Sequence, residues 1–148
     1  MRAAFLVEGS LFMLSDSSTT SLVDKLGMKD GLTVLILNPP PEYESTLGKL
    51  PTRMHFKTRP SPNLDFIQYF TESRHDLLTE MPQLKRSLSP TGTLWISWPK
   101  QSSAMETDLS EDIVREIGLK NGLVDVKVCA IDDTWSALKF VYKIEALP

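Results

Sequence analysis

One short apolar segment, residues 31–38, constrains the fold of this chain more than any other. It reads Gly-Leu-Thr-Val-Leu-Ile-Leu-Asn and is followed by three consecutive prolines, Pro39 to Pro41. An apolar run that ends at a turn signal in this way predicts a strand buried on both faces. Sheets built from such strands are covered by helices on both sides, so the segment indicates an α/β protein. The sequence thus predicts a fold with some clarity and leaves the function open.

The loop after this strand differs from the loop expected in a nucleotide-binding α/β protein. Such loops are rich in glycine, which lets the backbone approach a phosphate or a cofactor sugar. Here the loop is Asn-Pro-Pro-Pro, which is stiff and lacks three backbone N–H donors. The sequence therefore gives no reason to predict a cofactor.

The rest of the chain alternates between helical and strand patterns. Strands are predicted at residues 54–57, 64–70, 93–98, 124–130 and 135–144, and helices at residues 21–27, 42–50, 73–88 and after a cap at Asp108 or Ser110. Pro82 predicts a break of the third helix into segments 73–80 and 82–88, and residues 89–92 predict a turn. This alternation gives a three-layer α/β fold whose mostly parallel sheet ends in a C-terminal antiparallel hairpin.

The length of 148 residues fits one domain. We place that domain at residues 21–148 and expect residues 1–20 to be a flexible N-terminal extension. Residues 1–14 faintly resemble a signal peptide, but Glu8, Gly9 and Ser10 interrupt the apolar run. Two other interpretations stay open: an extension upstream of an alternative start at Met13, or a short docking helix.

Charge and cysteine content exclude several classes of function. The net charge of −3 and the scattered Lys and Arg residues argue against nucleic-acid binding and against a polybasic membrane surface. No apolar stretch approaches the length needed to span a bilayer. Cys129 is the single cysteine, so no intrachain disulfide forms, a cytoplasmic location is expected, and the thiol is expected in the packed interior. His55 and His75 show no spacing typical of a zinc site.

Two sequence features resemble the class I methyltransferase fold: the terminal hairpin, and the turn-strand unit Leu-Ser-Pro-Thr-Gly-Thr-Leu-Trp-Ile-Ser at residues 88–97. A narrower resemblance rests on Lys25-Leu26-Gly27, on Ser-Trp-Pro-Lys at residues 97–100, and on the last block, residues 124–140. With these segments the chain resembles a bacterial family of small Rossmann-like proteins, the domain of unknown function 3052 family, over residues 21–141. The resemblance implies a Rossmann-like, methyltransferase-like fold and no particular reaction.

Three departures from the methyltransferase pattern bear on activity. Prolines replace the glycines that let the backbone approach S-adenosylmethionine. The acidic residue expected at the end of the second strand to bind the ribose is replaced by a basic segment, Lys57 to Arg59. One helix–strand unit of the full fold is also missing between Pro60 and Leu64. These departures argue against methyl transfer.

A ligand site is predicted at the carboxyl edge of the sheet. Parallel strands end at one edge, and ligands bind there at the switch point of strand order. We place that point between strand 31–38 and the strand that ends at Phe70. Loops 38–43, 71–74, 99–103 and 131–135 then converge and contribute the candidate ligand-binding residues Asn38, Tyr43, Ser73, Arg74, Lys100, Asp132 and Trp135.

These residues favour a small anionic ligand. Arg74, at a helix start, and Lys100 would hold its charge, while Tyr43 or Trp135 stacks on it. The alternative is that Arg74 and Lys100 are solvated charges paired with acidic residues of loop 131–135. No residue is predicted to be catalytic or to bind a metal.

The main interpretation is a non-catalytic binder of a small anionic ligand on a Rossmann-like scaffold. One alternative is a divergent S-adenosylmethionine-dependent methyltransferase. Another is a protein-interaction module that uses an edge strand or the N-terminal segment, with a second copy of the chain as one candidate partner. A deep cavity beside Asn38 is the observation that would favour ligand binding.

Overall fold

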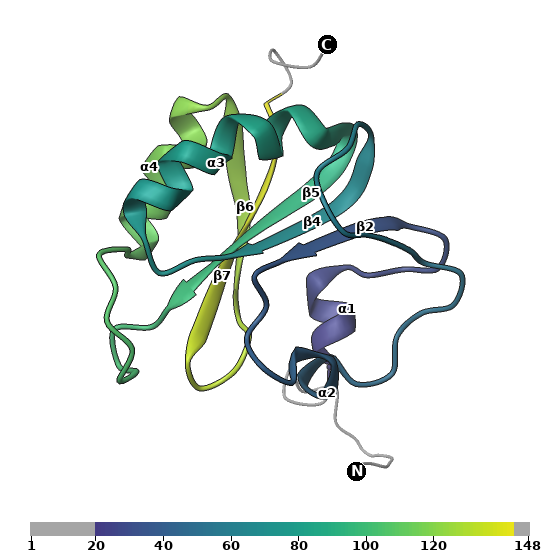
Figure 1. The fold of residues 1–148 in the computed structure, drawn as a ribbon, viewed down its shortest axis with the longest axis horizontal. Coiled ribbons are helices and arrows are strands. Elements are labelled where there is room, and N and C mark those ends of the chain that lie inside the picture. Colours follow the sequence, from purple (N-terminus) through teal and green to yellow (C-terminus); the bar gives the residue numbers. More distant parts are fainter. Residues whose placement is uncertain (1–19, 144–148) are drawn as a thin grey trace.

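Six strands form one sheet in the order β3-β2-β4-β5-β7-β6 (Figure 1). The computed structural model describes residues 20–143, so residues 1–19 of the predicted extension at 1–20 and the end of the last predicted strand, Ile144, lie outside the described residues. The elements are α1 (Leu22–Leu26), β2 (Thr33–Leu37), α2 (Tyr43–Leu47), β3 (His55–Lys57), β4 (Leu64–Phe70), α3 (Arg74–Ser87), β5 (Leu88–Pro99), α4 (Glu111–Lys120), β6 (Leu123–Ala130) and β7 (Trp135–Tyr142).

The topology confirms the predicted fold class. β2 pairs in parallel with β3 on one side and with β4 on the other, and β4 pairs in parallel with β5. β7 is antiparallel to both β5 and β6, which makes the C-terminal hairpin. The chain runs outward from β2 to β3 and then returns across β2 to β4. The switch point therefore lies between β2 and β4, as predicted.

Helices cover both faces of the sheet (Figure 1). α3 and α4 lie on one face, over a core that includes Leu35, Ile67 and Ile96. α1 and α2 lie on the other face, over a core that includes Phe66 and Trp95. Trp95 and Trp98 belong to the two different cores, as their odd spacing requires. The helix predicted at residues 21–27 is present as α1. The Ser21 hydroxyl accepts the Asp24 N–H, and Gly27 closes the helix in the left-handed conformation at φ 82°.

The break predicted at Pro82 is wrong, because α3 is one continuous helix with Pro82 inside it. Pro82 cannot donate the hydrogen bond to the carbonyl of Leu78 that a helix normally makes. Both Leu78 and Pro82 are exposed, so water can reach that carbonyl. The buried face, with Leu77, Met81 and Leu84, continues unbroken past the proline.

The turn predicted at residues 89–92 is also wrong, because β5 begins at Leu88 directly after α3. Leu64 pairs with Leu88 and Phe66 pairs with Thr93, so β5 carries extra residues at a register shift. Gly92 permits this shift, since a Cβ there would lie 2.8 Å from the carbonyl oxygen of Leu64. The residues that signalled a turn thus form an irregular part of a strand.

The edge strand β6 shows a less regular pattern than its sequence suggests. A register shift falls between Asp125 and Lys127. Val126 and Val128 are about half exposed, whereas Cys129 is buried in the α1/α2 core, as expected of a packed thiol. No helix within residues 20–143 has the length and apolar character needed to cross a bilayer.

Candidate functional site

The predicted loops gather at the carboxyl edge of the sheet. β2, β4 and β5 all end there, and Trp135 at the start of β7 pairs with Pro99 at the end of β5. The backbone N–H of Lys100 donates to the carbonyl of Thr134 at 2.7 Å, which joins the loop after β5 to the β6–β7 turn. The strand order and these contacts therefore place four loops along one edge.

The turn after β2 reverses the chain without glycine. Asn38 has φ 56° and Glu42 has φ 63°, so a left-handed residue stands on each side of the three prolines. Asn tolerates this conformation better than most residues because its side chain can hydrogen-bond locally. The tight reversal that glycine would allow is thus made by Asn38, and α2 begins directly afterwards at Tyr43.

A cavity lies beside this turn, as the ligand-binding interpretations require. Its volume is about 340 Å³, and it is lined by Ile36, Pro39, Pro40, Tyr43, Glu44, Leu47, Leu50 and Phe56. This volume falls at the lower end of the range of about 300–1,000 Å³ found for small-molecule sites. Most of the wall is apolar, and Glu44 is the one charged residue among the described residues that line it. The cavity therefore suits a flat apolar group with a polar substituent near Glu44.

Tyr43 connects the cavity to a buried polar chain across the sheet. Its hydroxyl donates to Gln68 Oε1 at 2.7 Å, and Gln68 Nε2 donates to Ser97 Oγ at 3.1 Å. Gln68 and Ser97 are fully buried, and burial raises the pKa of the Tyr43 hydroxyl far above its usual value. Buried polar groups with all their partners specify one arrangement. The hydrogen bonds from Tyr43 through Gln68 to Ser97 therefore hold α2 in place on the sheet.

The Trp135 ring, one of the two rings predicted to stack on a ligand, takes part in core packing. The Phe70 ring lies edge-to-face between Tyr43 and Trp135, with centroid distances of 4.9 and 5.2 Å. Trp135 is 6% exposed, and Tyr43 is 3% exposed at the cavity wall. The Phe70 ring of β4 therefore joins Tyr43 to Trp135 within the α1/α2 core.

The N-terminus of α3 already has hydrogen-bond partners within the chain. The Ser73 hydroxyl accepts the Asp76 N–H at 3.1 Å, and Asp108 Oδ1 accepts the Arg74 N–H at 2.8 Å. Of the two residues predicted as alternative caps of α4, Ser110 is the cap. Asp108 instead accepts the N–H of Arg74 in the first turn of α3, whose own N-cap is Ser73. An anion bound at Ser73 and Arg74 would have to replace the Asp108 carboxylate.

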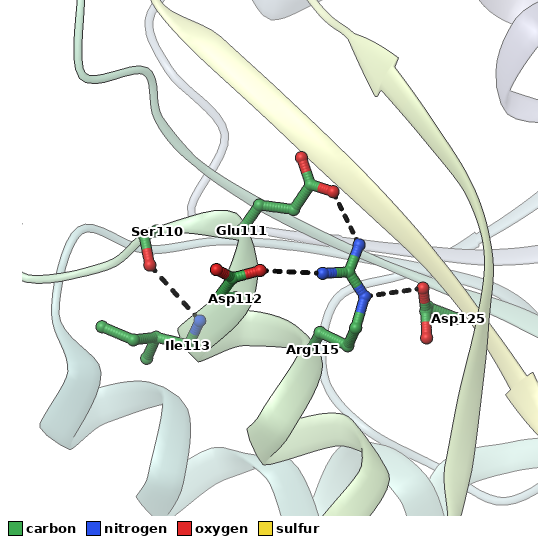
Figure 2. A network of polar contacts seen from close by, with 6 residues as sticks. All are labelled: Ser110, Glu111, Asp112, Ile113, Arg115 and Asp125. Atoms are coloured by element: carbon green, nitrogen blue, oxygen red, sulfur yellow. Dashed lines mark hydrogen bonds and ion pairs between the residues drawn. The ribbon is translucent and has the colours of Figure 1, made fainter.

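Lys100 lines a separate hollow of about 560 Å³ at the N-terminus of α4. The other lining residues are Trp98, Gln101, Ser102, Ser110, Glu111, Asp112 and Ser136. Figure 2 shows that Arg115 pairs with both acidic residues of this hollow, Glu111 at 2.6 Å and Asp112 at 3.1 Å, and with Asp125 of β6 at 2.9 Å. Arg115 thus offsets part of the negative charge beside Lys100 and ties α4 to β6.

Asp132 has a structural role in the β6–β7 turn. Its Oδ1 accepts the N–H groups of Thr134 and Trp135, both at 2.8 Å, which is the local bonding expected of an aspartate in a turn. Within the described residues, no group of three or more His, Cys, Asp or Glu side chains is placed to hold a metal ion.

Sequence reasoning missed three residues of the site region. Gln68 carried a readable signal, because it is the polar residue near the middle of the aromatic strand at residues 64–70. Glu44 and Phe56 carried none, because their role follows from the approach of α2 to β3, which the sequence pattern does not specify.

Comparisons with known proteins show what the fold resembles. No protein-family model and no curated protein sequence matches this chain, so the resemblance to the domain of unknown function 3052 family stays a prediction. A structure of a SAM-dependent methyltransferase from Aquifex aeolicus is 17% identical, with a TM-score of 0.58 over 80% of this chain and 86% of that one. Magnesium protoporphyrin IX methyltransferase from Synechocystis, with bound SAH, is 11% identical, with a TM-score of 0.54 over 77% and 75%. The putative methyltransferase in complex with the Trm112 methyltransferase activator of Haloferax volcanii is 13% identical, with a TM-score of 0.58 over 80% and 85%. The chain therefore has a Rossmann-like, methyltransferase-like α/β fold.

Proposed function

We propose that this chain is a divergent S-adenosylmethionine-dependent methyltransferase that binds the adenosyl end of its cofactor in the cavity beside Asn38. The observation that carries the proposal is the position of this cavity, which lies between α2 and β3 and opens next to the loop that follows the carboxyl end of β2. Parallel α/β sheets bind their ligands outside the carboxyl ends of their strands. The methyltransferase-like fold supports the same assignment.

The lining residues fit part of such a cofactor. The walls formed by Pro39, Pro40 and Phe56 suit an adenine ring, and the Glu44 carboxylate can accept hydrogen bonds from hydroxyl groups. The prolines donate no backbone N–H, so side chains must make the polar contacts that this loop would otherwise supply. S-adenosylmethionine carries an electrophilic methyl group, so the protein's task is to hold it beside an acceptor in the correct orientation.

Isothermal titration calorimetry with S-adenosylmethionine and S-adenosylhomocysteine tests the proposal. The variant Leu50→Trp replaces an aliphatic side chain in the cavity wall with a bulky indole ring, and we expect it to weaken binding by about tenfold or more. Leu119→Trp on the exposed side of α4 is the matched control and should leave the affinity unchanged. Absence of heat from both ligands with the unmodified chain would reject the proposal, and so would equal binding by the Leu50→Trp variant.

A second candidate is non-catalytic binding of a small anionic ligand, the main interpretation from the sequence. It is favoured by the hollow in which Lys100 and Ser102 lie beside the N-terminus of α4. Titration with inorganic phosphate and adenosine monophosphate, comparing the unmodified chain with Arg74→Ala and Lys100→Ala, tests it. If neither substitution weakens binding by about tenfold, the anion is not held by these residues.

A further inference from the structure

The edge strand β3 is exposed along its whole length. It lies at one end of the sheet and pairs with β2 alone among the described strands. All three of its residues are exposed, and the Phe56 ring is 49% exposed. An edge strand has backbone N–H and C=O groups on its outer side that no neighbouring strand satisfies. The strand can therefore accept another strand on that side.

The charge around β3 is the reverse of the charge of the chain. Residues 45–64 include Lys49, Arg53, Lys57 and Arg59 and no acidic residue, although the chain has a net charge of −3. All four cations are exposed. Within residues 20–143 none of them forms an ion pair, whereas Arg115 and Lys120 do. This segment is thus a local basic surface whose cations form no ion pair among the described residues.

The register of β3 fixes what an added strand would meet. Phe56 pairs with Val34 and lines the cavity on the α2 side of the sheet. His55 and Lys57 point to the opposite side, because neighbouring residues of a strand alternate. The residues of a strand added outside β3 would also alternate between the two sides of the sheet. Those on one side would lie on the Phe56 side, and those on the other would lie on the side of His55 and Lys57.

We propose that the β3 edge binds an extended acidic peptide segment of a partner protein as an additional strand. Its apolar residue packs on Phe56, and its acidic residues lie beside Lys57 and the neighbouring cations. Main-chain pairing supplies affinity and alternate side chains supply specificity in this mode of recognition. The bound strand also closes the outer wall of the cavity, but the proposal does not depend on cofactor binding.

Two features separate this surface from an edge that is merely protected against aggregation. Protective lysines blunt an edge, but here an exposed phenylalanine lies between the basic residues. The other edge strand, β6, has two exposed valines, Val126 and Val128. Its neighbouring charges are mixed, with Lys127 between the valines and Asp125 before them, so it does not favour a partner of either charge. A peptide fits β3 better than a nucleic acid, because only a peptide can pair with the open backbone groups of an edge strand.

Fluorescence anisotropy on the full chain tests the proposal. The probe is a labelled peptide pool in which Asp alternates with an equal mixture of Val, Ile, Leu and Phe. We expect it to bind the unmodified chain and to bind the double variant Lys57→Glu/Arg59→Glu about tenfold more weakly or worse. The control variant Arg86→Glu/Lys120→Glu makes the same charge change on exposed positions of α3 and α4 and should bind within about twofold of the unmodified chain.

A second pool with N-methylated backbone tests whether the peptide pairs as a strand. N-methylation removes the N–H donors, so we expect about a tenfold loss of affinity or more. No binding of the first pool, equal binding by the Lys57→Glu/Arg59→Glu variant, or equal binding of the methylated pool would overturn the proposal. Tighter binding of a single-stranded RNA of equal charge would overturn it too, and would identify the surface as a nucleic-acid site. The peptide assay contains no S-adenosylmethionine. Its result can therefore be interpreted even if the chain does not bind S-adenosylmethionine.

Discussion

Strands β5 and β3 belong to the same sheet, yet they are built in opposite ways. β5 has twelve residues and neighbours on both sides, and residues 94–99 of it are all buried. β3 has three residues, one neighbouring strand among those described, and no buried residue. Burial of apolar surface is the main favourable term in folding, so the centre of the sheet carries the stability. The residues on the β3 side contribute less to stability, and the cavity and the basic surface lie on that side.

The polar groups of the two regions differ in the same way. In the centre, Gln68 and Ser97 are fully buried and bonded to each other, and the Trp95 indole N–H donates to the carbonyl of Leu26 at 2.9 Å. At the β3 edge, Lys57 and Arg59 are exposed without ion pairs among the described residues. Polar groups that are satisfied internally fix a structure, whereas exposed groups without partners are available for binding.

The largest expected effect comes from Trp95→Ala in the centre. Trp95 is fully buried, and its removal leaves a cavity and an unpaired carbonyl at Leu26. We expect a loss of about 3–5 kcal/mol in the free energy of unfolding, measured by urea denaturation. Phe56→Ala on β3 should change it by less than about 1 kcal/mol. Comparable losses for the two variants would contradict the division between centre and edge.

A smaller loss is expected from Gly118→Ala in α4. A Cβ at this position would lie 2.1 Å from the Phe140 ring, which is fully buried in β7. Ala favours the helix by about 1 kcal/mol over Gly, but overpacking a rigid core costs about 1–3 kcal/mol. We expect a net loss of stability in urea denaturation, since α4 must move away from the sheet. An increase in stability would show that the α4 side of the core is less tightly packed than the structure has it.

Tyr43→Phe tests the link between the centre and the site. The variant leaves Gln68 Oε1 without its donor, which costs about 1–3 kcal/mol near neutral pH. Burial raises the pKa of Tyr43 in the folded state. The contribution of the Tyr43 hydroxyl to the free energy of unfolding is therefore fully present below the unfolded-state pKa of about 10. It is lost as the pH rises above that value. Urea denaturation at about pH 8 and about pH 11 should show the difference between the two proteins shrinking at the higher pH.

The fold was predictable where one physical effect dominates. The apolar run at residues 31–38, the helices that start near residues 21 and 73, and the alternation in the last two strands each follow from a local pattern of burial or polar residues. Predictions failed where tertiary contacts override a local signal. Pro82 stays in a helix because its exposed position lets water satisfy the freed carbonyl, and Gly92 allows residues 88–92 to join a strand instead of turning.

The candidate site was predictable in position but less so in detail. Parallel strands must end at one edge, so the position of loops 38–43, 71–74 and 99–103 along that edge follows from the element order. The cavity beside Pro39 and the hollow at Lys100 are nevertheless separate. Which groups are free there depends on partners from distant segments, such as Asp108 at the N-terminus of α3 and Phe70 against Trp135. The cavity itself arises from the space between α2 and β3, and no short sequence pattern encodes that distance.

The smallest expected effect is that of Lys57→Glu/Arg59→Glu on stability. Both side chains are exposed, and no ion pair or side-chain hydrogen bond among the described residues involves them. Exposed substitutions of this kind usually change the free energy of unfolding by less than about 0.5 kcal/mol. Reducing the repulsion within the basic segment offsets what little is lost, so the urea midpoint should stay unchanged and depend little on salt. A large loss in the free energy of unfolding would mean that Lys57 and Arg59 help to stabilise the fold. The β3 edge would then belong with the stabilising centre of the sheet and not with the side that contributes less to stability.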